Sequence, residues 1–340
     1  MRLFSMFSGY GGAEFAFKKA NINIQVIGYC EIEPAAIKIY ENNFGNHIKN
    51  YGDVSKVNII DVPEFDILTA GFPCQPFSVA GKQMGELDPR GTLFFDILRI
   101  TKHHKPKYMI LENVKGLTTK KFTSTFNKII QSIEELGYIV NWKVINSKDY
   151  GVPQNRERVW FVCIRNDINN NFKFPDKLEL KTFLQDILLS DVDNKYLLTG
   201  ETLERVKSKM KDKNITKPIM LHNIYGGFKE KEVRIFDTYS PTIRTPAGGG
   251  HLPFIMSTLT EAFGRSGSSK EYLKSVLTIK EATNVYRKLT PRECFRLMGF
   301  LDDEIILDGL SDTKLYKLAG NGWDINLASK IIKNIFTEEA

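Results

Sequence analysis

The chain has 340 residues, enough for one large domain or two ordinary ones. Its hydrophobic content of 42% and charged content of 26% are typical of a globular protein, and no apolar run is long enough to span a bilayer. A net charge of +7 suggests a polyanionic partner, although the acidic residues are spread among the basic ones.

The four cysteines exclude two common roles for that residue. Cys30, Cys74, Cys163 and Cys294 lie far apart and form no CxxC pair. This pattern argues against a zinc site and against a disulfide framework, and it is typical of a reducing cytoplasm. The first residues reach glycines at once, so we expect no signal peptide.

The first half of the chain alternates apolar strands with amphipathic helices. We expect strands at residues 2–7, 24–30, 65–70, 108–111, 140–144 and 159–164, and helices at 13–20, 34–44, 93–101 and 122–136. This alternation predicts an α/β fold with a mainly parallel sheet and helices on both faces.

After about Phe174 the alternation stops. Residues 187–285 are lysine-rich and irregular with clusters of glycine, and we expect a second, smaller, loop-rich domain there. Order returns near Leu289, where Thr290 is expected to cap a helix that begins at Pro291, with Glu293 completing a capping box. A last helix is expected from about residue 325 to 335.

A thiol stands at the end of the third predicted strand, in Gly71-Phe72-Pro73-Cys74-Gln75-Pro76-Phe77-Ser78. Ligands of open α/β sheets bind at the carboxyl ends of the strands, and two prolines stiffen the turn that carries Cys74. A free cysteine is more often a small buried hydrophobe. The polar neighbours Gln75 and Ser78 favour a reactive thiol in this case.

A glycine turn, Phe7-Ser8-Gly9-Tyr10-Gly11-Gly12, follows the first predicted strand. Glycines let a backbone approach a nucleotide-like ligand closely. Glu31 ends the second strand, where an acid can accept both ribose hydroxyls, and Asp53 can accept from an adenine amino group. Each acid alone is more often a cap or a solvated charge. The glycine turn and the two acids follow one another in this order, and the chain has no Walker-type sequence. Together they predict an adenosine ligand with no phosphate clamp.

Two further motifs carry charge. In Glu112-Asn113-Val114, a carboxylate at the end of a buried strand would be desolvated, which favours its protonated form; a helix-start acid is an equally good interpretation. In Gln154-Asn155-Arg156-Glu157-Arg158, paired arginines suit phosphate or carbonyl oxygens, whereas a solvated charge run is the commoner meaning.

Taken together, these motifs closely resemble those of the DNA (cytosine-5) methyltransferases of bacterial restriction–modification systems and phages. The resemblance covers residues 1 to about 165 and about 288 to the end. Beyond the segments already quoted, it is carried by Asp88-Pro89-Arg90-Gly91-Thr92-Leu93-Phe94, Leu289-Thr290-Pro291-Arg292-Glu293-Cys294 and Gly320-Asn321-Gly322.

The resemblance implies a Rossmann-like S-adenosylmethionine-dependent methyltransferase sheet with a smaller target-recognition domain. Residues 1–186 and 318–340 would form the catalytic domain, 187–287 the recognition domain and 288–317 a hinge. Such an enzyme transfers a methyl group from S-adenosylmethionine to carbon 5 of a cytosine flipped out of a specific double-stranded DNA sequence. It would act as a monomer in the bacterial cytoplasm, at the nucleoid, in some cases beside a cognate restriction endonuclease.

The resemblance also implies residue roles. Cys74 would attack carbon 6, Glu112 would hold the ring nitrogen and amine, Arg158 would bind the carbonyl, and Arg156 would anchor nearby acids or phosphate. Residues 79–91 would close over the flipped base. The cofactor pocket would use Phe7, Gly9, Gly11, Glu31, Ile32, Asp53, Pro73, Leu93 and Asn321. DNA contacts would come from Gln75, Ser78, Arg90, Arg234, Thr242 and Arg244.

The chain departs from the family pattern in three places. Ser5 stands where many members have an acid, Ile32 stands where a bulkier side chain is common, and Gly322-Trp323 replaces the usual end of the last motif. Trp323 could pack on the cofactor or on the core. Three rival functions are a non-catalytic DNA-binding relative, a transfer RNA cytosine-5 methyltransferase on the same fold, and a Rossmann dehydrogenase. The first should have lost Cys74 or Glu112, and the last has no need of a Pro-Cys-Gln thiol.

Overall fold

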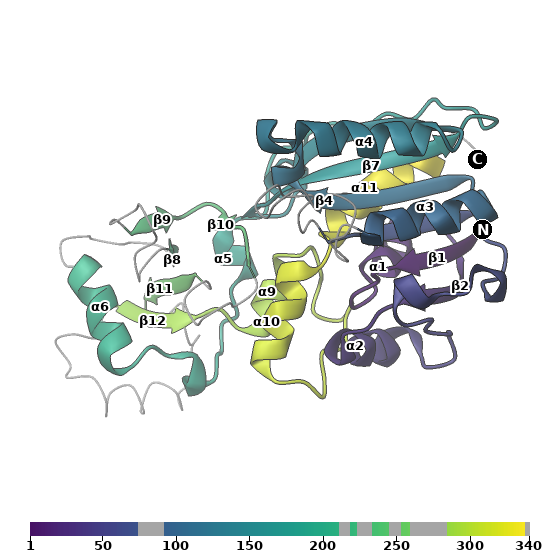
Figure 1. The fold of residues 1–340 in the computed structure, drawn as a ribbon. Coiled ribbons are helices and arrows are strands. Elements are labelled where there is room, and N and C mark those ends of the chain that lie inside the picture. The colour runs from purple at the N-terminus through teal and green to yellow at the C-terminus, as the bar shows by residue number, and fades with distance from the viewer. Residues whose placement is uncertain (74–91, 211–217, 223–232, 245–252, 259–283, 337–340) are drawn as a thin grey trace, which may run out of the picture.

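The computed structural model describes residues 1–73, 92–210, 218–222, 233–244, 253–258 and 284–336. Its main body is a six-stranded sheet with helices on both faces (Figure 1). The strands are β1 (Arg2–Met6), β2 (Gln25–Cys30), β3 (Ile67–Gly71), β4 (Tyr108–Val114), β5 (Tyr138–Asn146) and β7 (Glu157–Arg165).

These strands lie in the order β2-β1-β3-β4-β7-β5. Neighbours from β2 to β4 are parallel, whereas β7 is antiparallel to both β4 and β5. The predicted mainly parallel sheet is therefore confirmed, and the reversal of β7 was not anticipated. This reversal matters for the site, because it brings the start of β7 beside the carboxyl end of β4.

Both faces of the sheet are covered because the central strands are apolar on both sides. In β7, Val159 and Phe161 pack into one core and Trp160 and Val162 into the other, as the alternation of side chains along a strand requires. One face is covered by α1 (Gly12–Ala20), α2 (Pro34–Phe44) and α11 (Ile325–Phe336), and the other by α3 (Thr92–His104) and α4 (Thr123–Glu134).

The chain returns to the main body at its end. The predicted capping box is confirmed at α9 (Pro291–Arg296): Glu293 N donates to Thr290 Oγ1 at 3.2 Å, and Thr290 N donates to Glu293 Oε2 at 2.7 Å. Helix α10 (Asp312–Asn321) follows, and α11 then packs along α1. This return places residues 321–323 against the glycine turn after β1.

A second sheet stands apart from the first in Figure 1. It is antiparallel, in the order β12-β11-β8-β9. Its strands are β8 (Ile219–His222), β9 (Arg234–Phe236), β11 (Phe254–Thr258) and β12 (Asn284–Lys288), and α6 (Gly200–Met210) packs on it through Val206 and Met210. This sheet and helix, in the described part of residues 187–285, were not anticipated from the sequence.

A short parallel pair, β6 (Gln154–Asn155) with β10 (Ser240–Pro241), joins the main body to the part that carries the second sheet. In Figure 1, β10 lies next to α5 (Leu184–Ile187). Thr242 Oγ1 donates to the Asn155 carbonyl at 2.6 Å. The side chain of Gln154 is buried, accepting from Ile243 N at 3.0 Å and donating to the Leu297 carbonyl at 2.6 Å. Gln154 thus connects β6 to the segment after β10 and to the end of α9.

Across the described part of the chain, no helix has the length and apolar character needed to cross a membrane.

The return of the chain end to the main body buries Asp324, which gives a first testable prediction. Its Oδ1 accepts the N–H groups of Asn326 and Leu327 at 3.0 Å each, at the start of α11. Burial raises the pKa of Asp324 to about 6. The folded state therefore holds a proton that the unfolded chain releases, and stability falls as pH rises from about 4 to about 6.

We expect D324N to remove this pH-dependent change in the free energy of unfolding, which amounts to roughly 2 kcal/mol between pH 4.5 and pH 7.5. Asparagine keeps a carbonyl oxygen for the cap and has no charge to lose. Urea unfolding at the two pH values measures the change, with D303N at an exposed aspartate as the control. An equal pH dependence in D324N and the wild type would contradict the expectation.

Candidate active site

The site begins with a buried carboxylate at the carboxyl end of β4. Glu112 is 8% exposed, and its Oε1 lies 3.0 Å from Nε of Arg158 in β7. The antiparallel register sets Arg158 opposite Val114, two residues from Glu112, so both side chains project from the same face. Burial raises the pKa of Glu112, while Arg158 and Arg156 oppose that shift. A carboxyl so placed can hold a proton and donate it.

The turn that carries the predicted nucleophile is anchored to this strand. The side chain of Asn113 is buried, and its Nδ2 donates to the Phe72 carbonyl at 3.1 Å. This bond holds the turn up to exposed Pro73 beside Glu112. We assigned no role to Asn113 from the sequence, although the Glu-Asn-Val motif contains it. Four predicted site residues lie outside the described ones: Cys74, Gln75, Ser78 and Arg90.

Arg156 binds main-chain carbonyl oxygens, one of the two kinds of oxygen expected for the paired arginines. It is 2% exposed, and its guanidinium donates to the carbonyls of Gly322 at 2.7 Å and Gly320 at 3.2 Å, with a longer contact of 3.5 Å to Ile243. The guanidinium is enclosed by these protein carbonyls, and the role of Arg156 in anchoring nearby acids or phosphate stays a prediction. Burial, with the nearby charge of Arg158, lowers the pKa of Arg156 to about 9, so it stays charged at neutral pH.

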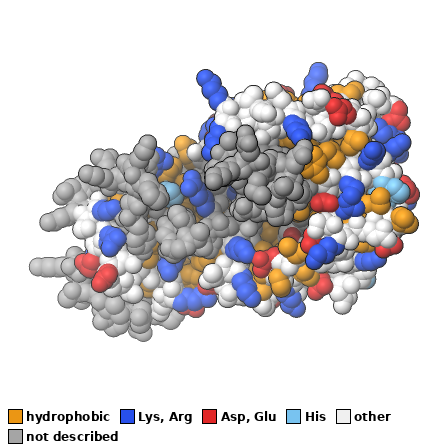
Figure 2. Space-filling view, viewed as in Figure 1, with side chains coloured by type: hydrophobic (Ala, Val, Ile, Leu, Met, Phe, Trp, Pro, Cys, Tyr) orange, Lys and Arg blue, Asp and Glu red, His pale blue; other side chains and the backbone are white. Residues whose placement is uncertain are grey.

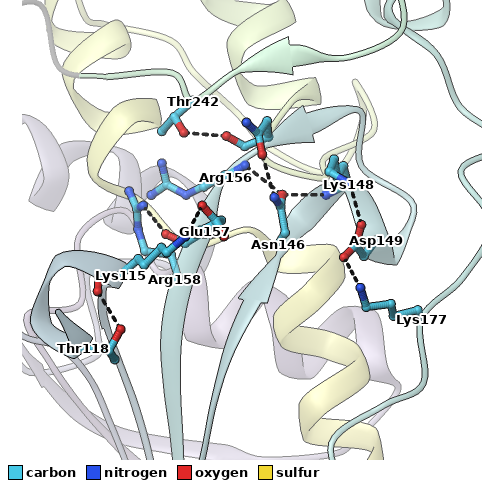
Figure 3. Close-up of polar contacts among 11 residues, drawn as sticks. Lys115, Thr118, Asn146, Lys148, Asp149, Arg156, Glu157, Arg158, Lys177 and Thr242 are labelled. Atoms are coloured by element: carbon cyan, nitrogen blue, oxygen red, sulfur yellow. Dashed lines mark hydrogen bonds and ion pairs between the residues drawn. The ribbon is translucent and has the colours of Figure 1, made fainter. Parts of the chain in front are cut away.

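A cavity of about 450 Å³ opens in front of Arg158. Its walls come from both parts of the molecule and include Lys115, Glu157, Arg158, Thr242, Arg244 and Asn321. Lys115 Nζ donates to both carboxylate oxygens of Glu157, at 2.8 and 2.9 Å (Figure 3). A pocket with this polar lining suits a flat ligand that carries several donors and acceptors.

The glycine turn and Glu31 meet as predicted. Gly9 N donates to Glu31 Oε2 at 2.8 Å, and Glu31 Oε1 accepts from Ile32 N and Glu33 N, also at 2.8 Å each. Phe7 has a φ of 54°, a value that non-glycine residues seldom adopt and that is often found at binding sites. The turn therefore presents its backbone, with a fixed carboxylate beside it, at the edge where β1 and β2 end.

The other predicted cofactor residues are spread along the same edge. Asp53 caps the turn Val54–Lys56, and the hydrogen bond from Ser55 lowers its pKa. Ile32 is 68% exposed. Leu93 is half-buried at the start of α3, and Gly11 precedes α1 in a left-handed conformation.

Asn321 lies where two cavities adjoin. It lines the cavity in front of Arg158 and also a smaller one beside Phe7, Gly9 and Gly71. In the smaller cavity the buried Ser8 hydroxyl has no hydrogen-bond partner among the described residues. An open glycine turn, a fixed acid and an unpaired hydroxyl together fit an adenosine-containing ligand.

On the face drawn in Figure 2, the described basic side chains form no single strip. Figure 2 shows Lys and Arg side chains scattered among Asp and Glu over the described part of this face. Arg234 in β9 and Arg244 after β10 are both exposed, and Arg244 lines the larger cavity. Thr242 is half-buried and already donates to the main chain of Asn155. Their predicted DNA contacts stay predictions.

Comparison with known proteins identifies the class. The model of the C-5 cytosine-specific DNA methylase family matches residues 1–337, and the chain belongs to that family. It is a DNA (cytosine-5) methyltransferase that uses S-adenosylmethionine as methyl donor. The predicted family, fold class, activity and cofactor are thus confirmed.

Particular relatives agree with this. The chain is 37% identical over 336 residues to the type II methyltransferase M.HhaI of Haemophilus parahaemolyticus, covering 98% of this chain and 94% of that one. It is 35% identical to M.SsoII of Shigella sonnei, covering 99% and 80%. The solved structure of S. pombe Dnmt2 methyltransferase shares the fold, with a TM-score of 0.70 at 19% identity, covering 100% and 99%.

The departure at Gly322 has a structural cause. A Cβ atom at this position would lie 2.2 Å from the hydroxyl oxygen of Tyr10. The Tyr10 hydroxyl donates to the Trp323 carbonyl at 3.0 Å, so the ring has no free direction in which to move. The ring is also packed edge-on or tilted against Phe15, Phe295 and Phe300. Glycine is needed here because an aromatic residue occupies the space next to it.

We therefore expect G322A to lower the free energy of unfolding by about 1–3 kcal/mol, as overpacking does in a rigid core. The control is G116A, where the added Cβ would meet only Val114 Cγ2, at 3.8 Å. In a background carrying Y10L the cost of G322A should shrink, which a double-mutant cycle in urea measures. Equal stability of G322A and G116A would show that Tyr10 does not impose the glycine.

Proposed function

We propose that this methyltransferase acts on a cytosine flipped out of double-stranded DNA into the cavity in front of Arg158, with Cys74 as nucleophile. The observation that carries the proposal is the buried Glu112–Arg158 pair, 3.0 Å apart, beside the turn that leads into Cys74. Enzymes that modify a base must take it out of the stack, and they read its hydrogen-bonding edge in a pocket.

Each group then has a chemical task. The Cys74 thiolate would add to carbon 6 of the ring, forming an S–C bond as the carbon 5–carbon 6 double bond opens. Protonated Glu112 would donate to the ring nitrogen and accept from the exocyclic amine, which makes carbon 6 more electrophilic. Arg158 would donate to the ring carbonyl. S-adenosylmethionine supplies an electrophilic methyl group for carbon 5. Loss of the carbon 5 proton and of the thiolate restores the double bond.

The donor would lie along the carboxyl edge of the sheet. Glu31 would accept the ribose hydroxyls at the end of β2, and Asp53 the adenine amine. Further contacts would come from Phe7, Gly9, Gly11, Ile32, Pro73, Leu93 and Asn321. Support comes from the hydrogen bond between Gly9 and Glu31 and from the position of Asn321 between the two cavities.

Recognition of the target would come from residues 187–287, hinged to the catalytic domain through 288–317. Arg234 and Arg244 are candidate readers of guanine, because arginine binds that base bidentately, although a single arginine more often contacts phosphate. Thr242, Gln75, Ser78 and Arg90 would contact the DNA near the flipped base. We further propose that the enzyme works as a monomer in the bacterial cytoplasm, at the nucleoid, in some settings beside a cognate restriction endonuclease.

Replacement of the thiol tests the proposal. C74A should lower methyl transfer to DNA on the order of 10³-fold or more, because the covalent route is lost. C163A is the matched control: its thiol is buried in β7 between core residues, and it should keep wild-type activity. Transfer of labelled methyl groups to genomic DNA, with transfer RNA as a second substrate, gives the rates.

The same variants test the covalent step itself. Duplex DNA carrying 5-fluorocytosine cannot release the carbon 5 substituent, so the wild type and C163A should each form a complex that survives a denaturing gel. C74A should form none. A trapped complex with C74A, or methyl transfer to transfer RNA as fast as to DNA, would contradict the proposal.

A further inference from the structure

The indole of Trp323 lies between the two halves of the proposed site. Trp323 is 7% exposed, and a Cβ placed on Gly71 would lie 2.9 Å from its Nε1. The same point lies 3.8 Å from Glu112 Oε2. The indole and the buried carboxylate therefore border the same glycine, at the carboxyl end of β3.

The neighbours of Trp323 fix its position. Its ring meets the Trp160 ring edge-on, with centroids 4.9 Å apart. Its carbonyl accepts the Tyr10 hydroxyl at 3.0 Å, and its Cβ lies 3.2 Å from the point where a Cβ of Gly12 would stand. The part of the indole that remains uncovered lines the small cavity shared with Phe7, Gly71 and Asn321. The side chain is a fixed aromatic wall of that cavity.

The order of the strands indicates which part of the methyl donor the Trp323 indole would contact. This step rests on the proposed function. The adenosine end is assigned to Glu31 after β2, and the acceptor base to Glu112 after β4. Strands β1 and β3 lie between those two strands. The charged sulfonium, which carries the methyl group, must therefore lie over the ends of β1 and β3, where the small cavity is found.

We propose that Trp323 binds the sulfonium of the methyl donor through its indole and so favours the donor over the demethylated product. An aromatic face attracts a cation, and tryptophan does so more strongly than phenylalanine. S-adenosylhomocysteine has the same adenosine and amino acid parts but no positive sulfur. The interaction therefore distinguishes substrate from product by charge alone, and it assists product release after each transfer.

The test compares binding of the two ligands. Isothermal titration of wild type, W323F and W323L with S-adenosylmethionine and with S-adenosylhomocysteine gives six dissociation constants. We expect W323L to weaken binding of the donor by about five- to tenfold, the range of a partly desolvated cation–π contact. Binding of the product should weaken less than about twofold. The affinity of W323F for the donor should lie between those of the wild type and W323L, about twofold below the wild type.

The ratio of the two affinities is the readout, because partial unfolding of a variant scales both constants equally and leaves their ratio unchanged. Should W323L fail to fold, W323F still carries the test. An unchanged ratio in both variants, whether binding of both ligands weakens or neither does, would overturn the proposal.

A second variant separates this inference from the proposed function. E31A should weaken binding of both ligands equally, because each carries the ribose. If E31A binds both as the wild type does, the proposed cofactor placement fails. If E31A loses both ligands while the Trp323 variants keep the wild-type ratio, only the role of Trp323 fails.

Discussion

One buried guanidinium connects the catalytic sheet, the last sequence motif and the segment that leads to the second sheet. Arg156 donates to the carbonyls of Gly320 and Gly322 in the last motif and approaches the carbonyl of Ile243 after β10. Hydrogen bonds from a charged donor are worth about 1.5–3 kcal/mol each, and a buried charge left without them is costly. The last motif and the segment leading to the second sheet are therefore tied to one residue just before β7. Gln154, two residues earlier, strengthens the same junction.

The electrostatics of the site follow from this arrangement. Two arginines and one carboxylate are enclosed together, and their charges act on one another with little solvent screening. Arg158 forms the direct ion pair with Glu112, while Arg156 is held back by main-chain carbonyls and acts on the carboxylate from a distance. Burial still raises the pKa of Glu112, so the group can alternate between donor and ion-pair partner. A carboxyl that must protonate a base and later release it needs this balance.

Much of this could be predicted from the sequence, for local reasons. The carboxyl ends of parallel strands meet at one edge, and Glu31, Glu112 and the turn before Cys74 were each expected at the carboxyl end of a strand. The capping box at Thr290 is a signal within four residues. The rest depends on contacts between distant segments. A run such as Gln154–Arg158 looks like a solvated or phosphate-binding cluster until the chain end returns over it. Gly322 is explained only by a tyrosine more than three hundred residues earlier. The second sheet was missed because its strands are short and lie in lysine-rich sequence.

Arg156 couples the last motif to the segment after β10, and hydrogen exchange measured by mass spectrometry tests this coupling most directly. In R156M, a folded protein should exchange amide hydrogens faster than the wild type in both 318–324 and 240–244. R165M, at the other end of β7 where Arg165 pairs with Asp167, is the control and should leave both segments unchanged. If R156M keeps wild-type protection in the two segments, the guanidinium does not join them and the account is wrong.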